Sequence, residues 1–174
     1  MKQLNAAELE QGLEGIRRSP EDHGTVEMIV RRPDVDEREV LEQGEFSTTD
    51  GLVGDTWKSR GSSRTSDGSA HPEMQLNIMN ARVIDLVATS RERWPLAGDQ
   101  LFIDLDLSED NLPPGTQLEL GTATIEVTAI PHTGCKKFVA RFGLDAMKFV
   151  NSDISESLKL RGINAKVWFI QGIP

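Results

Sequence analysis

Basic residues and long apolar runs are both scarce in this chain of 174 residues. Lysine and arginine number 19 against 28 aspartates and glutamates, which gives a formal net charge of −9. This balance argues against general nucleic-acid binding, because neutralising phosphates requires a basic face. No apolar run is long enough for a transmembrane helix, and residues 1–12 lack the apolar core of a secretory signal. We therefore expect a cytoplasmic protein that binds neither nucleic acid nor membranes.

Cysteine is scarcer still. The single thiol, Cys135, excludes an internal disulfide and a zinc site built from cysteines alone. Neither the phosphate-binding pattern GxxxxGK[ST] nor the dinucleotide-binding pattern GxGxxG occurs in the sequence. The length corresponds to about one domain, and a chain of this size can bury a core without a disulfide or a metal. Composition alone therefore predicts a soluble globular domain.

Alternation of apolar and polar residues predicts a series of short strands. We expect them at residues 25–32, 38–46, 74–79, 101–107, 117–120, 122–130 and 165–170. Helices are expected at 81–90, where Asn80 is the N-cap, and at 136–142 and 144–150. Residues 1–24 are interpreted as an exposed N-terminal extension with some helical character, and residues 25–174 as the domain itself.

Strands dominate this pattern, and no parallel β-α-β unit is visible in it. The sequence therefore predicts a mainly β domain, a closed or nearly closed barrel with a few short peripheral helices, because closure removes exposed sheet edges. The expected core residues are Val26, Met28, Val30, Leu76, Ile103, Ile125, Val127, Val167 and Phe169. Residues 56–71 are rich in Ser, Gly and Arg, and we interpret them as a long, exposed and mobile loop near the mouth that holds Cys135.

Cys135 lies directly after the strand at 122–130, in a turn made by Pro131 and Gly134. Lys136, Lys137 and Arg141 follow within six residues, and no acidic residue lies between 131 and 143. Positive charge and the start of a helix both favour the thiolate form of a cysteine. These are the requirements of a nucleophilic or sulfur-accepting thiol.

Other interpretations of the thiol stay open. Free cysteine is among the most buried residue types, so Cys135 could be a small core residue. His132 and Cys135 have the spacing of half a metal site, but no second half is visible. A Cys–His hydrolase would need His132 beside the thiol and a third group to orient it, and no protease signature surrounds Cys135. Residues 59–69 could form an anion-binding nest of backbone N–H groups, or could simply be disordered.

Several stretches taken together resemble the MOSC domain, the C-terminal domain of molybdenum cofactor sulfurases, which also occurs as stand-alone bacterial proteins. The resemblance rests on residues 51–55 (GLVGD), 110–115 (DNLPPG), 118–128 (LELGTATIEVT), 161–167 (RGINAKV) and on Cys135 with Lys137, Arg141, Phe142 and Gly143. Each motif alone is weak, but their order and spacing are fairly specific. The sequence departs from the family at Thr56-Trp57-Lys58, where many relatives have a basic residue and a histidine, and at Asp110, where Glu is usual.

The resemblance implies a β-barrel that binds the molybdenum cofactor, a pterin with a phosphate. It implies that Cys135 carries sulfur as a persulfide and faces the metal, that a pyridoxal-phosphate-dependent cysteine desulfurase donates the sulfur, and that a molybdoenzyme or the cofactor accepts it. With the cationic stretches, it gives the candidate cofactor-binding residues Lys58, Arg60, Arg64, Asn111, His132, Lys136, Lys137 and Arg141. The alternatives are a molybdenum-cofactor-dependent reductase of N-hydroxylated compounds and a non-catalytic barrel that only binds a partner.

Overall fold

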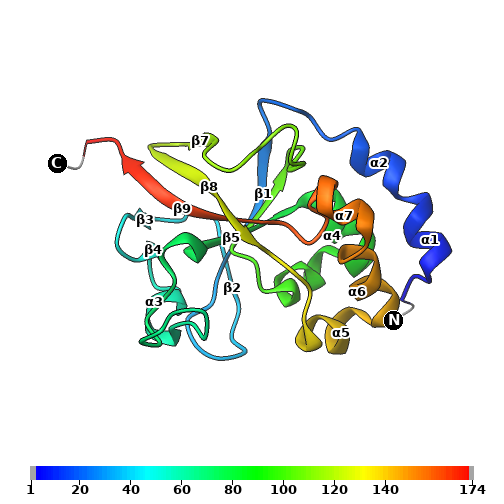
Figure 1. Ribbon diagram of the computed structural model, residues 1–174, viewed down its shortest axis with the longest axis horizontal. Helices are drawn as coiled ribbons and strands as arrows, with labels where there is room; N and C mark the ends of the chain where they lie inside the picture. Colours follow the sequence, from blue (N-terminus) through cyan, green and yellow to red (C-terminus); the bar gives the residue numbers. More distant parts are fainter. Residues whose placement is uncertain (1–2, 173–174) are drawn as a thin grey trace.

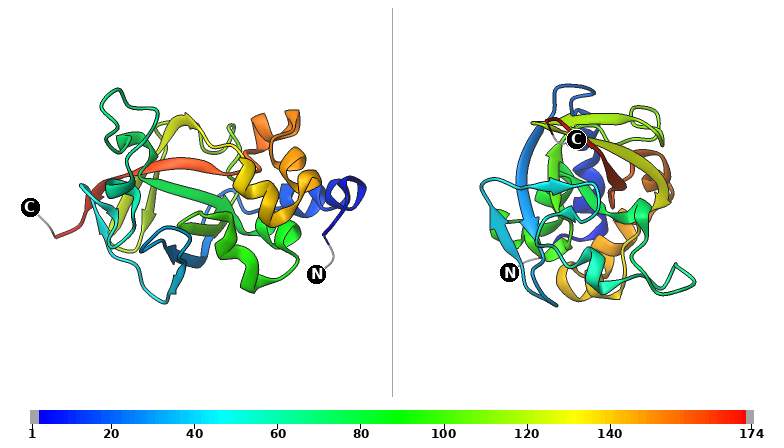
Figure 2. Two further views of the ribbon diagram at one scale, coloured as in Figure 1. Left: turned by 90° about the horizontal axis from the view of Figure 1, so that it is seen from below. Right: turned by 90° about the vertical axis from the view of Figure 1, so that its left-hand side faces the viewer.

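The computed structural model describes residues 3–172 and consists of a curled seven-stranded sheet with helices gathered at one end (Figure 1). The strands follow the order β2-β1-β6-β5-β9-β8-β7, and β3 and β4 form a separate two-stranded ribbon. Figure 2 shows that β3, β4 and α3 lie at the end of the sheet opposite to α1, α5 and α6. No helix within the described residues is long and apolar enough to cross a membrane.

The strands are β1 (Thr25–Arg31), β2 (Glu39–Leu41), β3 (Phe46–Ser47), β4 (Gly51–Leu52), β5 (Leu76–Asn80), β6 (Leu101–Asp104), β7 (Gln117–Leu120), β8 (Ala123–Pro131) and β9 (Ile163–Ile170). The α-helices are α1 (Ala6–Gln11), α2 (Leu13–Arg17), α3 (Trp57–Arg60), α4 (Ala81–Ala88), α5 (Lys136–Phe142), α6 (Leu144–Val150) and α7 (Asp153–Leu158). Two 3₁₀ helices, η1 (Pro72–Met74) and η2 (Arg91–Ala97), precede β5 and β6.

The predicted closed, mainly β barrel is wrong. The sheet is open, and helices and strands make up 31% and 26% of the described residues, so the fold is mixed α/β. The missed feature is a β-α-β unit in which β5 and β6 run parallel and α4 connects them. As expected, the Asn80 side chain caps α4 by accepting a hydrogen bond from the Arg82 backbone. Because the chain between α4 and β6 includes the 3₁₀ helix η2, strand and turn patterns in the sequence do not reveal this unit.

Two apolar clusters form the core. One lies between the sheet and helices α1, α4, α5 and α6, and the other fills the concave side of the sheet. Seven of the nine predicted core residues are buried, but Val26 and Phe169 are 39% and 51% exposed. The pairing register shifts between β1 and β6 next to Val26, and between β8 and β9 next to Phe169. Side chains therefore do not alternate regularly between the two faces of the sheet at these residues. A bulge turns a side chain from one face of the sheet to the other, so alternation alone places both residues wrongly.

Two flanking segments also differ from expectation. The N-terminal segment is not an exposed extension, because Leu9 of α1 and Ile16 of α2 are buried in the first cluster. Residues 56–71 are mostly exposed, as predicted, but they are not structureless. They begin with α3, which buries Trp57, and Ser62 donates a backbone hydrogen bond across the loop to Gly68.

Candidate functional site

Cys135 is exposed and is the N-cap residue of α5. The helix is anchored below it by the buried rings of Phe138 and Phe142. The turn before it is held by Asn151, whose side chain accepts a hydrogen bond from the Gly134 N–H at 2.8 Å and donates one to the Gly134 carbonyl at 3.2 Å. The predicted accessibility of the thiol is therefore confirmed, and its backbone is fixed from two sides.

The thiol lines a cleft of about 460 Å³ whose walls are rich in arginine. Its cationic side chains come from five separate parts of the chain and are Arg32, Arg38, Arg60, Lys137, Arg141 and Arg161. The carboxylates that line the same cleft are Asp34 and Asp36. In a protein of net charge −9, this is a marked local excess of positive charge.

Arg32 forms one wall through a buried ion pair with Asp55. Its Nε and Nη2 atoms donate to the two carboxylate oxygens at 2.8 and 2.6 Å, and its backbone N–H donates to the same carboxylate at 2.8 Å. The Arg32 side chain is 5% exposed and that of Asp55 is fully buried. Although burial by itself would raise the pKa of Asp55, the hydrogen bonds and charge of Arg32 hold it below its ordinary value. The pair ties the end of β1 to the loop after β4.

A second buried group, Asp99 with His132 and Arg161, lies in the same cleft wall. The Asp99 carboxylate accepts hydrogen bonds from Arg161 Nη1 at 2.7 and 3.0 Å, and lies 2.7 Å from His132 Nε2. Burial by itself would raise the pKa of Asp99, but Arg161 and His132 keep it below its ordinary value. Burial and the nearby Arg161 lower the pKa of His132 despite Asp99. The neutral imidazole therefore donates its Nε2 proton to Asp99 and keeps the lone pair of Nδ1 free.

Two cleft arginines lack a carboxylate within ion-pair distance among the described residues. The Arg38 side chain donates only to the backbone carbonyls of Pro95 and Glu37, and the Arg60 side chain forms no hydrogen bond or ion pair within residues 3–172. Loss of hydration and repulsion from neighbouring arginines lower the pKa of both guanidinium groups. Because charges crowded in this way are costly unless an anion neutralises them, the cleft favours an anionic ligand.

The structure brings together some of the predicted cofactor-binding residues. Arg60, His132, Lys137 and Arg141 line the cleft with Cys135. Arg64 lines an adjoining hollow of about 440 Å³, which shares Arg60 with the cleft. Lys136 and Lys58 are exposed outside it, and Lys58 pairs with Asp50 at 2.7 Å. Asn111 lies elsewhere and donates hydrogen bonds to the carbonyls of residues 21 and 106.

The sequence reasoning placed Asp55 in a loop that faces the site, but it missed Arg32, Arg38, Arg161 and Asp99 as parts of that site. Arg32 carried a usable signal, since it is a charged residue at the end of an apolar strand and directly before Pro33. Asp99 likewise precedes an apolar strand. Their partners are 23 and 62 residues away in the chain, so only the folded sheet reveals the pairs.

No group of three or more His, Cys, Asp and Glu side chains that could hold a metal ion is present among residues 3–172. A metal at Cys135 would therefore have to arrive as part of a larger bound group. The donor set of the cleft fits such a group if it is anionic: the arginines suit a phosphate, and the exposed thiol is a soft ligand.

Comparisons with known proteins define the fold and little more. No protein-family model matches the chain, and no curated protein matches it. A solved structure described as the crystal structure of an hypothetical protein is similar, with a TM-score of 0.54 and 18% sequence identity. The similarity covers 80% of this chain and 59% of that one, so the chain spans well under two thirds of its neighbour's length.

Proposed function

We propose that this protein is a sulfur carrier that binds the molybdenum cofactor and holds a persulfide on Cys135. One observation carries the proposal: an exposed thiol opens onto a cleft in which Arg38 and Arg60 have no carboxylate partner within the described residues. A phosphate-bearing ligand would neutralise these arginines while its other end reaches the sulfur. The resemblance of the sequence to the MOSC domain supports the choice of this ligand.

The chemistry of the carrier step is a sulfur transfer without net oxidation. The Cys135 thiolate attacks the outer sulfur of a persulfide on a pyridoxal-phosphate-dependent cysteine desulfurase. The S–S bond of the donor breaks, the donor cysteine leaves as a thiolate, and Cys135 becomes a persulfide. Lys137 and Arg141 line the cleft with Cys135, and both pair with Asp36, at 3.8 and 3.2 Å.

The same side chains have separate roles in holding the cofactor. Arg38, Arg60 and Arg141 would bind its phosphate, and Cys135 would face its metal end. When bound, the cofactor supplies a molybdenum centre that can accept sulfur or carry electrons. The buried pairs Arg32–Asp55 and Arg161–Asp99 fix the walls, and Arg141 pairs with Asp36, which leaves Arg38 and Arg60 without a carboxylate partner within the described residues.

The carrier role is tested by incubating the full chain with a cysteine desulfurase and L-cysteine, followed by intact mass spectrometry. The expected result is the addition of one sulfur atom, mapped to Cys135 and removed by a thiol reductant. The Cys135→Ser variant should gain none. A donor that carries its own persulfide while Cys135 of this protein stays unmodified would contradict the carrier role.

A molybdenum-cofactor-dependent reductase would use the same cleft, and metal analysis separates the two functions. Protein expressed in a molybdenum-competent host would then contain nearly one molybdenum per chain and reduce an N-hydroxylated compound with an external electron donor. A carrier would accept sulfur on Cys135 without that activity.

A further inference from the structure

The open sheet leaves two strand edges without partners on the side away from the Cys135 cleft. Within residues 3–172, β7 pairs only with β8, and residues 25–28 of β1 pair only with β6. Unpaired edges present backbone N–H and C=O groups that can accept another strand. The strand order ends at β2 and β7, and a gap lined by Val26 of β1 and Leu120 of β7 lies between β7 and the part of β1 that β2 does not cover.

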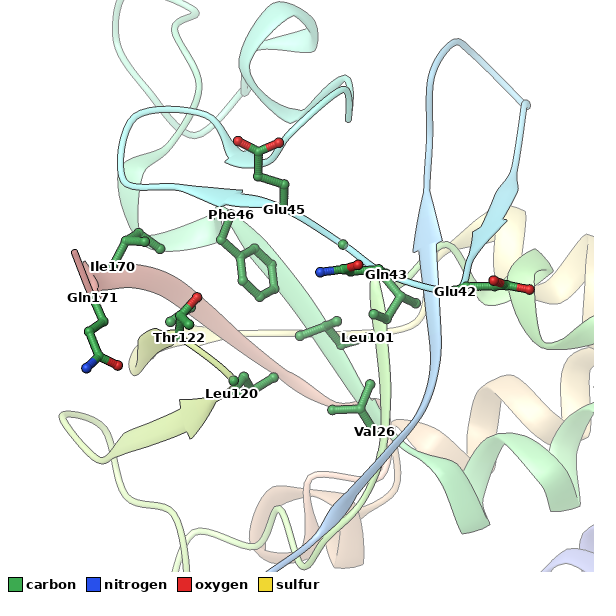
Figure 3. A pocket seen from close by; sticks show the side chains of 14 residues that line it. Val26, Glu42, Gln43, Glu45, Phe46, Leu101, Leu120, Thr122, Ile170 and Gln171 are labelled. Carbon is green, nitrogen blue, oxygen red and sulfur yellow. The ribbon is translucent and has the colours of Figure 1, made fainter. Parts of the chain in front are cut away.

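This gap is a groove made of two hollows of about 850 and 670 Å³, which share Val26, Leu120 and Gly121. Val26 of β1 and Leu120 of β7 lie on opposite sides of it, and Phe46 and Leu101 line the same space (Figure 3). The floor belongs to the second apolar cluster, in which Leu101 and Ile103 are buried and Phe46, Leu118 and Leu120 are half-buried beside them. None of the residues lining the groove also lines the Cys135 cleft.

The charge of the groove is opposite to that of the cleft. Glu42 and Glu45 line one hollow, and Glu21, Asp22 and Glu119 line the other. Among the described residues that line the groove, none is lysine or arginine, and the only histidine, His23, lies 3.5 Å from Asp22. The groove thus combines an apolar floor with an acidic rim.

The pattern of β7 defines what an added strand must look like. Leu118 and Leu120 are half-buried, whereas Gln117 and Glu119, which alternate with them, are exposed, and all four line the groove. The side chains of a strand paired with β7 would alternate between the two faces of the sheet. Its apolar side chains would then lie next to Leu118 and Leu120, and the side chain between them would lie next to Glu119. Opposite charge is favoured at that position, and like charge is not.

We propose that this groove binds an extended segment of a partner protein in which apolar residues alternate with lysine or arginine. The segment pairs with β7 by main-chain hydrogen bonds, its apolar side chains pack on the half-buried apolar side chains of the groove, and its cations meet the acidic rim. A second copy of this chain does not suit the groove, because a symmetric contact places the same surface of both copies face to face and would bring two acidic rims together. This interaction is independent of the chemistry proposed for Cys135.

The experiment uses fluorescence anisotropy with the full chain and a fluorescein-labelled peptide, Lys-Val-Lys-Val-Lys-Val-Lys. The Glu119→Lys variant should weaken binding by about tenfold or more, because it replaces attraction with repulsion at the paired position. Glu10→Lys, the same change at an exposed position in α1, is the matched control and should bind like the wild type. Cys135→Ser should also bind like the wild type, which separates this result from any failure of the carrier role.

Two further peptides test the mode of binding. N-methylation of the valines removes main-chain donors and should abolish binding, and a Glu-Val repeat should not bind. Hydrogen exchange of the β7 amides should slow when the lysine peptide is present. The proposal is overturned if the lysine peptide does not bind, if the acidic or N-methylated peptide binds equally, or if Glu119→Lys and Glu10→Lys behave alike. It is also overturned if sedimentation shows a dimer that Glu119→Lys dissociates, since the occupant would then be a second copy.

Discussion

His132 shows which properties of a residue can be predicted from the adjacent sequence and which depend on contacts with distant parts of the chain. The sequence places it three positions before Cys135, where a Cys–His hydrolase would also need a third group to orient the imidazole, and no protease signature surrounds Cys135. The structure supplies that group as Asp99, which is buried and holds the imidazole at 2.7 Å. The exposure of Cys135 could be predicted from the turn and its cationic neighbours, because these are local in the chain. The Asp99 contact could not, because it depends on how the loop before β6 meets the end of β8.

The lowered pKa of His132 predicts how stability depends on pH. The unfolded chain takes up a proton as the pH falls through about 6.5, the ordinary value for histidine, whereas the folded protein resists protonation. The unfolded state then binds more protons, so the free energy of unfolding falls on acidification, by at most about 1.4 kcal/mol per pH unit from this group. The His132→Gln variant should lose this part of the pH dependence, as measured by urea unfolding between about pH 7 and pH 5.

The matched control is His23→Gln, because the His23 side chain is 96% exposed. It should keep the pH dependence of the wild type. An unchanged slope in His132→Gln would show that other groups cause the loss of stability in acid, and the assignment of a neutral, buried imidazole would be abandoned.

At the scale of the elements, most strands could be located but their arrangement could not. The two-residue turn between β7 and β8 and the long strands β8 and β9 follow from local alternation and turn residues. The parallel pairing of β5 with β6 does not, since it is a choice between partners far apart in the chain. The bulges that expose Val26 and Phe169 are equally invisible to a rule of strict alternation.

Gly162 is an element-scale constraint that can be tested. It joins α7 to β9 beside Arg161 with φ of 115°, and a Cβ atom there would lie 2.1 Å from the Ile78 carbonyl oxygen in β5. The Gly162→Ala variant should therefore lose several kcal/mol of unfolding free energy, because the backbone of β5 would have to move. The Gly115→Ala variant is the control. Its φ of 92° is also positive, but nothing lies within 4 Å.

Denaturant unfolding of both variants separates steric conflict from backbone strain. Gly115→Ala should cost only the strain, about 1–2 kcal/mol. Equal losses in the two variants would mean that β5 does not approach Gly162 as closely as described. A loss of cleft binding in Gly162→Ala at temperatures where it remains folded would show that the same contact also positions Arg161.

For the whole molecule, the distribution of charge matters more than its total. The net charge of −9 predicts that nucleic acids are not partners. The folded chain nevertheless gathers arginines in one cleft and carboxylates along the groove, although neither cluster is contiguous in the sequence. Two parts of the cleft could be seen beforehand, the run from Lys136 to Arg141 and Arg60 in the cationic loop, because each belongs to a cluster of cations within a short stretch of chain.

The clustering of arginines in the cleft, apart from the carboxylates of the groove, predicts that a small polyanion stabilises the protein by binding in the cleft. Inorganic pyrophosphate at about ten times its dissociation constant should add about 1.4 kcal/mol of unfolding free energy, which corresponds to a rise of about 3–6 °C in melting temperature. Arg60→Gln should reduce this rise without lowering the starting stability, since Arg60 forms no hydrogen bond or ion pair within residues 3–172 that the substitution would break. Arg17→Gln, an exposed change in α2, should keep the full rise. A control with sodium chloride at the same ionic strength measures how much of the rise in melting temperature comes from general screening of charges. If the salt reproduces the stabilisation, or if Arg60→Gln and Arg17→Gln respond alike, the unpaired arginines do not form an anion site and the cofactor assignment loses its main support.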